Sequence, residues 1–332
     1  MDYRYTLRDA LLLIAALIVP AATYAQAPST GSGHAYPARP VRMVSPYPPG
    51  SSADIIGRIY SPKLTETLGR QFIVDNRAGA SGNIAAELVA HATPDGYTLL
   101  LLNNAIASSQ FLYKGLTFDV ARDFAAVGML GFAAYLLVVN VSLPVMNTQD
   151  LIAFARARPG KLTYASTGTG GGLHLTMEMF RMQTGITMLH VPYKGSSITV
   201  PEMIGGRIDT MFGSAPALLP HVRTGRIRAL GISSAARNAA APDVPTIAES
   251  GVPGFESISF TALAVPAATP RNIVILLNSA IAKSARSPEV SGALANQGTE
   301  PAPMTPQQSG EFIRNEIVKW KKVIAAAGVQ AE

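Results

Sequence analysis

The clearest pattern of apolar and polar positions lies between Val41 and Ile59. A short apolar strand over Val41–Ser45 leads into a turn rich in Pro, Gly and Ser, and apolar residues at helical spacing follow at positions 55, 56 and 59. The N–H groups at a helix start lack intrahelical partners and carry partial positive charge. This turn is therefore a candidate anion cradle, although any α/β domain also needs turns of this kind.

The same arrangement occurs a second time. Residues 161–166 predict a strand, Thr167–Gly172 a flexible turn, and the segment from Leu173 another helix. Gly50 precedes Asp54 by the same offset at which Gly170 precedes His174. We expect two halves of the molecule to present N–H groups to one cleft and to hold a carboxylate between them.

Strand and helix patterns alternate through the rest of the chain, which is typical of an α/β fold. Apolar runs at 97–102 and 135–141 predict buried strands, and further strands are expected at 72–75, 187–193, 208–212, 227–233 and 257–265. The chain should cross to a second domain near Asn140 and return through 235–255. A last helix over 307–327 should dock on the first domain, with Trp320 in the core.

The amino terminus predicts export. Arg4 and Arg8 precede the apolar run Ala10–Val19, and Pro20 and small residues follow, ending at Ala25 or Ala27. This is the pattern of a secretory signal peptide over 1–27, cleaved after one of these alanines, and 28–39 reads as a disordered leader. The alternative is an uncleaved anchor, but the run is shorter than the ~20 residues that a membrane span needs. We expect a periplasmic protein.

Composition narrows the function classes. The chain has 332 residues, of which 48% are hydrophobic and 14% charged, which is ample for a large core and favours two domains. It has no cysteine, so disulfides, thiolate catalysis and cysteine zinc sites are excluded. The net charge of +6 is spread without a basic run, which disfavours nucleic acid and suits the attraction of small anions.

The common catalytic patterns are missing from the sequence. The glycines from Gly168 onward do not fit a dinucleotide fingerprint, and no G-x-S-x-G or phosphate-loop motif occurs. The histidines are scattered, and His174 with Glu178 could form a metal pair but more simply a polar contact on one helix face. We therefore expect no catalytic residue, no metal and no cofactor, and binding rather than turnover.

Co-linear blocks from Tyr36 to the end resemble one family, the Bug-type periplasmic receptors of the tripartite tricarboxylate transporters. The blocks include YPARPVRMVSPYPPG, IVDNRAGASGNIAAELVA, KLTYASTGTGGGLHL, HVPYKGSSITVPEMIGGRIDTMF and PDVPTIAESGVPGFE. The resemblance implies an α/β, two-lobed periplasmic-binding-protein (Venus flytrap) fold, with two mixed sheets, flanking helices and a hinge. On this reading lobe 1 comprises 40–139 and 256–332, and lobe 2 comprises 140–255.

The resemblance also implies that two loops grip the carboxylate of the ligand. In the first loop the donors or walls would be Tyr47, Pro48, Gly50, Ser51 and Ser52, with Asp54 as an internal cap. The second loop would contribute Ser166, Thr167, Gly168, Thr169 and Gly170. The cleft would be completed by His174, Asn104, Lys194 and Ser214. For each residue taken singly, simple turn formation is the competing explanation.

Departures from the family pattern bear on the ligand. Many members carry an acidic residue where this chain has Gly213, so a partner for an ammonium group is missing, which favours a non-amino mono- or dicarboxylate. The leading hypothesis is a monomeric receptor that passes this acid to the membrane subunits of a tripartite tricarboxylate transporter, or reports it to a sensor protein. The rivals are an exported enzyme with His174 as base, and a structural or adhesion module.

Overall fold

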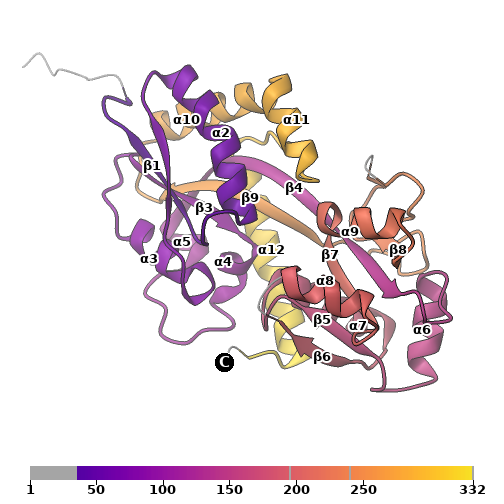
Figure 1. Ribbon diagram of the computed structural model, residues 1–332. Helices are drawn as coiled ribbons and strands as arrows, with labels where there is room; N and C mark the ends of the chain where they lie inside the picture. The colour runs from indigo at the N-terminus through magenta and orange to yellow at the C-terminus, as the bar shows by residue number, and fades with distance from the viewer. Residues whose placement is uncertain (1–35, 194–195, 239–240, 331–332) are drawn as a thin grey trace, which may run out of the picture. The chain divides into compact units, whose positions relative to one another are not determined.

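The strands form one hydrogen-bonded path through the part of the chain that the computed structural model describes, residues 36–193, 196–238 and 241–330. The order is β2–β1–β3–β9–β4–β7–β5–β6, and β8 pairs with β4 (Figure 1). The bounds are β1 (Val41–Ser45), β2 (Phe72–Asn76), β3 (Thr98–Asn103), β4 (Phe124–Asn140), β5 (Thr163–Ser166), β6 (Leu189–Pro192), β7 (Thr210–Ser214), β8 (Ile227–Ile232) and β9 (Ile258–Pro266).

Helices flank both parts of this sheet. Their bounds are α2 (Ser52–Leu68), α3 (Asn83–Ala90), α4 (Asn104–Ser109), α5 (Val120–Asp123), α6 (Thr148–Arg156), α7 (Gly172–Thr184), α8 (Ser196–Ile204), α9 (Ala215–Arg223), α10 (Arg271–Ala285), α11 (Pro288–Asn296) and α12 (Pro306–Ala327). A 3-10 turn, Ala80–Gly82, precedes α3. None of the described helices is both long enough and apolar enough to cross a bilayer.

Strand β4 joins two mixed sheets. It pairs antiparallel with β9 as far as Ala134, and from Tyr135 onward it pairs with β7 and β8 instead. On one side β1 is parallel to β2 and β3, and on the other β5 is parallel to β6 and β7. The predicted α/β class with mixed sheets and flanking helices is confirmed. The exchange of partners comes before the predicted crossing near Asn140.

The parallel strands explain where the functional loops lie. Chains leaving the carboxyl ends of neighbouring parallel strands emerge at one edge of a sheet, which is where open α/β folds bind ligands. Strands β1 and β3 are such neighbours; α4 begins directly after β3, and α2 begins after the turn that follows β1. The register pairs Val44 with Leu100, so the two strands end at similar heights.

Apolar side chains fill both faces of each sheet, and α12 contributes to two of these clusters. Its first half places Ile313 and Ile317 against β9 and α4, while Trp320, Val323 and Ile324 join the cluster around β5 and α7. Trp320 is only 1% exposed, and its indole N–H donates to Glu316 at 2.9 Å. The prediction that Trp320 is a core residue is confirmed. Helix α12 thus ties together elements of both sheets (Figure 1).

The predicted signal peptide lies outside the described residues, as does most of the predicted leader over 28–39. The fold begins at Tyr36 rather than Pro40, because residues 36–39 are fixed to the turn before β3. The Tyr36 hydroxyl donates to the Gly96 carbonyl, and the amide of Ala38 donates to the Tyr97 hydroxyl at 2.8 Å. From Tyr36 onward the chain forms one compact unit, and its division into two lobes stays a prediction.

Candidate functional site

The first turn, Pro46–Asp54, follows β1 and opens α2. Ser51 caps the helix, since its side-chain oxygen accepts from the Asp54 amide at 3.4 Å. Gly50 has a φ of +84°, a left-handed conformation that favours glycine. Residues 48–50 are exposed, whereas Ala53 and Asp54 are buried at the helix start. The turn therefore folds back over the first turn of α2.

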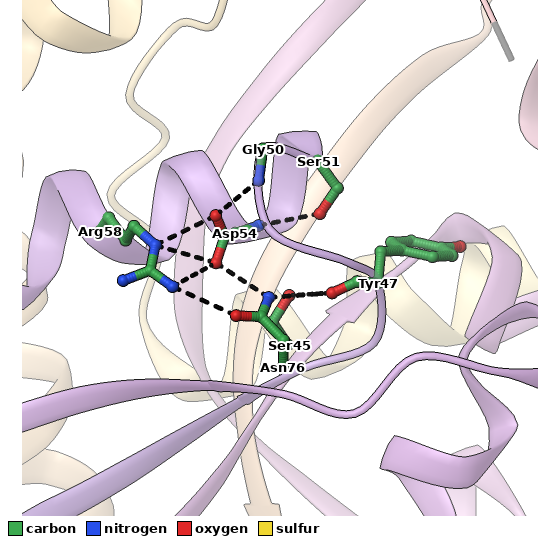
Figure 2. A network of polar contacts seen from close by, with 7 residues as sticks. All are labelled: Ser45, Tyr47, Gly50, Ser51, Asp54, Arg58 and Asn76. Atoms are coloured by element: carbon green, nitrogen blue, oxygen red, sulfur yellow. Dashed lines mark hydrogen bonds and ion pairs between the residues drawn. The ribbon is translucent and has the colours of Figure 1, made fainter.

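Asp54 is the internal anchor of this turn (Figure 2). Its buried carboxylate accepts from the Gly50 amide at 2.9 Å and from the Asn76 side-chain amide at 2.9 Å, and it pairs with the Arg58 guanidinium at 2.9 Å. Burial alone would raise the pKa of Asp54, but the hydrogen bonds from Arg58, Gly50 and Asn76 outweigh it and lower that pKa. The Gly50 N–H therefore donates its hydrogen bond within the loop.

The starts of three helices meet at one cavity of about 180 Å³. Its walls include Ser52 and Ala53 at the start of α2, Asn104 and Ala105 at the start of α4, and Gly172 at the start of α7. The first N–H groups of each helix have no carbonyl partner within the helix and lie at the positive end of its dipole. Three such ends around one small cavity make it a candidate anion site.

Neutral polar groups complete the walls of this cavity. They belong to the first turn, β3, β4 and β9, and they are Tyr47, Asn103, Tyr135, Ser259 and Thr261. Burial raises the pKa of Tyr135 to about 12, even though a hydrogen bond with Ser259 opposes the shift. Burial also raises the pKa of Tyr47. Both hydroxyls stay protonated at neutral pH and can donate to an anion.

Charge is missing from the walls of the cavity. Among the described residues that line it, none carries a charged side chain. An anion here would be neutralised by helix dipoles, N–H groups and hydroxyls, with neither an arginine clamp nor a carboxylate to meet an ammonium group. The described residues also include no group of three or more His, Asp or Glu side chains placed to hold a metal ion.

Asn104 lies in the wall, but its side chain is already engaged. Its Nδ2 donates to the Ile258 carbonyl at 2.9 Å, and its Oδ1 accepts from the Phe260 amide at 2.8 Å. Both bonds hold the start of β9 against α4. The sequence singled out Asn104 because it follows an apolar strand, and the structure makes it a brace for the wall.

The second turn, 166–171, has a different construction. Gly168 and Gly170 both have positive φ, at +138° and +75°. The Ser166 hydroxyl lies 3.2 Å from the Gly168 amide and 2.7 Å from Nε2 of His190. The Gly170 amide donates to Nδ1 of His174 at 2.9 Å. These bonds close the turn on itself, and only Gly172, at the start of α7, reaches the walls of the cavity.

The predicted site residues thus divide into groups. Tyr47, Ser52 and Asn104 line the cavity. Others shape the turns next to it without lining it, namely Pro48, Gly50, Ser51, Asp54, Ser166, Thr167, Gly168, Thr169, Gly170 and His174. Ser214 is exposed at the end of β7, where it pairs with the lining residue Tyr135 but does not itself line the cavity, and Lys194 lies outside the described residues.

Several lining residues were not predicted. Tyr135 and Ser259 lie in segments that were correctly predicted as strands, but strand patterns do not reveal which residues face a ligand. A Cβ atom on Gly172 would lie 2.9 Å from the Tyr135 hydroxyl, so Gly172 has to be small for this wall to close. The approach of β4 to the start of α7 is a tertiary contact with no local sequence signal.

Comparison with known proteins gives consistent results. The model of the family described as tripartite tricarboxylate transporter family receptor matches residues 56–329. Protein BugT of Bordetella pertussis is 38% identical over 301 residues, which cover 90% of this chain and 92% of BugT.

Solved structures show the same similarity. The Rpa4515 protein of R. palustris, solved with adipate, is 37% identical with a TM-score of 0.77, over 89% of this chain and 99% of that one. MatC from Rhodopseudomonas palustris, with bound malate, is 27% identical with a TM-score of 0.74, over 87% of this chain and 100% of that one.

Proposed function

This chain belongs to the tripartite tricarboxylate transporter receptor family and is a solute-binding receptor, and from that premise we propose that it captures a small carboxylate between its two turns. One observation carries the proposal, the convergence of the starts of α2, α4 and α7 on a cavity with uncharged walls among the described residues. A carboxylate fits because it accepts several N–H and O–H donors at once.

The ligand we propose is a non-amino mono- or dicarboxylate. Two similar structures contain adipate and malate, which supports a linear diacid. The described walls offer no carboxylate for an ammonium group, and this supports the same preference over an amino acid. At about 30 Å³ per water, a cavity of about 180 Å³ holds roughly six waters, which suits a small acid.

The hydrogen-bond donors around the cavity can supply the binding free energy that a micromolar dissociation constant requires. A dissociation constant of 1 μM corresponds to about 8 kcal/mol, and hydrogen bonds to a charged group contribute roughly 1.5–3 kcal/mol each. Four to six such bonds, less the cost of ordering the ligand, reach about that value. Closure of two lobes around the ligand would exclude water and strengthen each bond. We place these lobes at 40–139 with 256–332, and at 140–255.

We also propose that the protein acts in the periplasm as a monomer, after cleavage of the signal peptide behind Ala25 or Ala27. It would deliver its ligand unchanged to the membrane subunits of a tripartite tricarboxylate transporter. Turnover of the bound acid by the purified protein, followed by NMR, would instead favour an exported enzyme.

Calorimetry tests the proposal directly. Adipate, malate, acetate and glutamate should be titrated into the mature chain, and adipate or malate should bind whereas glutamate should not. A ligand at 100 times its dissociation constant should add about 2.7 kcal/mol to the free energy of unfolding. If none of these acids or related carboxylates binds, the proposal fails. Binding of glutamate alone would reverse the ligand preference.

The Tyr135→Phe variant tests the location of the site. It removes one hydroxyl donor from the cavity wall, and the loss of a hydrogen bond to a charged group should raise the dissociation constant roughly 10- to 150-fold. The matched control is Tyr113→Phe, because the Tyr113 hydroxyl contacts Ser81 at 2.7 Å outside the lining residues. Equal effects of the two variants would place the ligand elsewhere.

A further inference from the structure

A stack of three aromatic rings lies beneath the second turn. The rings of His174 and His190 are 3.9 Å apart at an interplanar angle of 8°, and the Tyr164 ring stacks on His190 at 4.8 Å. His174 is 5% exposed, on the first turn of α7, and His190 is half-buried on β6. None of these three residues lines the cavity, so the stack can act on the cavity only through the second turn.

His174 holds the turn through one hydrogen bond that depends on its charge state. Its Nδ1 accepts from the Gly170 amide at 2.9 Å, which requires a lone pair on Nδ1 and leaves the ring proton on Nε2. Nε2 is 3.8 Å from the carboxylate of Glu178. Protonation of Nδ1 would place two N–H donors face to face and remove the bond.

The surroundings of the ring favour the neutral form. The charged and titratable groups around the pair are Tyr164 of β5 and Glu178 and Arg181 of α7, beside His190 itself. Arg181 and Tyr164 bond to the Glu178 carboxylate, and this carboxylate opposes the lowering of the His190 pKa without overcoming the effect of burial. Burial, His190 and Arg181 together lower the pKa of His174 to about 3. Burial also lowers the pKa of His190.

We propose that His174 is a positioning residue for ligand binding, and that its neutral imidazole latches Gly170 so that protonation releases the second turn and weakens binding. The latch reaches the ligand through the chain, because Gly172, two residues after Gly170, is part of the cavity wall. A turn that has come loose carries Gly172 and the first N–H groups of α7 with it. This inference rests on the proposed function, since it assigns a control to the same site.

The direction of the effect follows from linkage. In a released turn the imidazole has its ordinary pKa of about 6.5, whereas in the latched turn it is much lower. Below pH 6.5 the released form binds a proton that the latched form does not, and each further pH unit favours release up to tenfold. The apparent dissociation constant rises as the latched fraction falls.

Affinity for adipate as a function of pH tests the proposal, with malate in its place if adipate does not bind. For the wild type we expect the dissociation constant to rise at least fivefold between pH 7.5 and 5.0. In His174→Asn, the Asn Oδ1 takes the place of Nδ1 and accepts from Gly170 but does not titrate. Its dissociation constant at pH 7.5 should lie within fivefold of wild type, and its rise over this range should be no larger than protonation of the free acid accounts for.

Two further variants separate positioning from general effects. His174→Ala has no acceptor for Gly170 and should bind at least tenfold more weakly at pH 7.5, again with only the pH dependence that protonation of the free acid accounts for. The control is His91→Asn, which changes an exposed histidine at the carboxyl end of α3, outside the lining residues, and should keep the wild-type profile. If the dissociation constant of His174→Asn depends on pH as strongly as that of the wild type, the proposal is overturned, because the titrating group is then not His174.

The tautomer gives a readout without ligand. Long-range proton–nitrogen NMR spectra of the free protein should show His174 protonated on Nε2 and not on Nδ1 at pH 7.5, and the Gly170 amide should be protected from exchange. Protonation on Nδ1 would overturn the latch even if every acid bound as expected. Conversely, the expected tautomer without binding of any acid would retain the latch and reject the proposed function.

Discussion

The two turns have the same layout but are anchored by opposite chemistry. In the first, the charged carboxylate of Asp54 receives the Gly50 amide, and in the second the neutral ring of His174 receives the Gly170 amide. The acceptor in each turn lies four residues after the glycine, on the first turn of a helix. Both acceptors turn a loop amide inward, so the helix starts are left to face the cavity.

The surroundings of the Asp54 carboxylate favour its charged form, whereas the surroundings of the His174 ring favour its neutral form. Arg58 and Asn76 compensate Asp54, so its charge is stable at low dielectric. His174 lies under apolar and aromatic neighbours, where an added charge would be costly. The first turn should therefore tolerate acid better than the second. The following experiments test this contrast, beginning with the largest expected effect.

Asp54→Asn should be the most damaging change. The new amide would direct N–H groups at the donors of Gly50, Asn76 and Arg58, and we expect a loss of about 3 kcal/mol in the free energy of unfolding, measured by urea denaturation. The control is Asp75→Asn, which removes a more exposed ion pair with Arg42 and Arg77 and should cost less than about 1 kcal/mol. Equal losses would show that the hydrogen bonds of Asp54 contribute no more to the free energy of unfolding than the more exposed ion pair of Asp75 does.

Acid should act on the second turn first. The pKa of His174 is about 3 in the fold and about 6.5 when unfolded, so its neutral form destabilises the fold progressively as pH falls below 6.5. From pH 7.5 to 5.0 this amounts to about 2 kcal/mol. Asp54 has a lowered pKa in the fold, so the stability it provides is present above its ordinary value near 3.9 and is lost only at lower pH.

Denaturation of the wild type and of His174→Asn at pH 7.5, 6.5 and 5.0 measures this slope. The asparagine variant should lack about 2 kcal/mol of the decline that the wild type shows. Parallel declines in the two proteins would assign the acid sensitivity to other groups and remove the contrast between the turns.

Much of the fold was predictable from the sequence, because it is encoded locally. Strand β1 was predicted over Val41–Ser45, as observed, and the last helix was predicted from Gln307 and begins at Pro306. The first half of β4, Phe124–Ala134, was missed. It is rich in Ala and Gly, which have low strand propensity, and its conformation comes from pairing with β9.

The site was predictable only in part, for a related reason. Glycine-rich turns before helices locate Ser52 and the start of α7 in the sequence, since helix starts have local signals. The direction in which each side chain points depends on contacts between distant segments. Asn104 lines the cavity, but its side-chain amide is engaged by Ile258 and Phe260 of β9, and Tyr135 enters the wall because β4 passes beside α7.

The glycines of the two turns provide the smallest expected effect. Both have positive φ, but a Cβ on Gly50 would meet nothing within 4 Å, whereas one on Gly170 would lie 2.8 Å from the Leu112 side chain. Gly50→Ala should cost about 1 kcal/mol from backbone strain alone. Gly170→Ala should cost up to about 1 kcal/mol more, because Leu112 must shift to make room.

A double-mutant cycle separates strain from crowding in the second turn. In a Leu112→Ala background the added cost of Gly170→Ala should disappear, leaving the strain of about 1 kcal/mol that Gly50→Ala also shows. Denaturant midpoints at pH 7.5, where His174 is neutral, measure each step of the cycle. If Gly170→Ala costs the same in both backgrounds, contact with Leu112 does not confine the second turn, and the difference between the turns lies in their anchors alone.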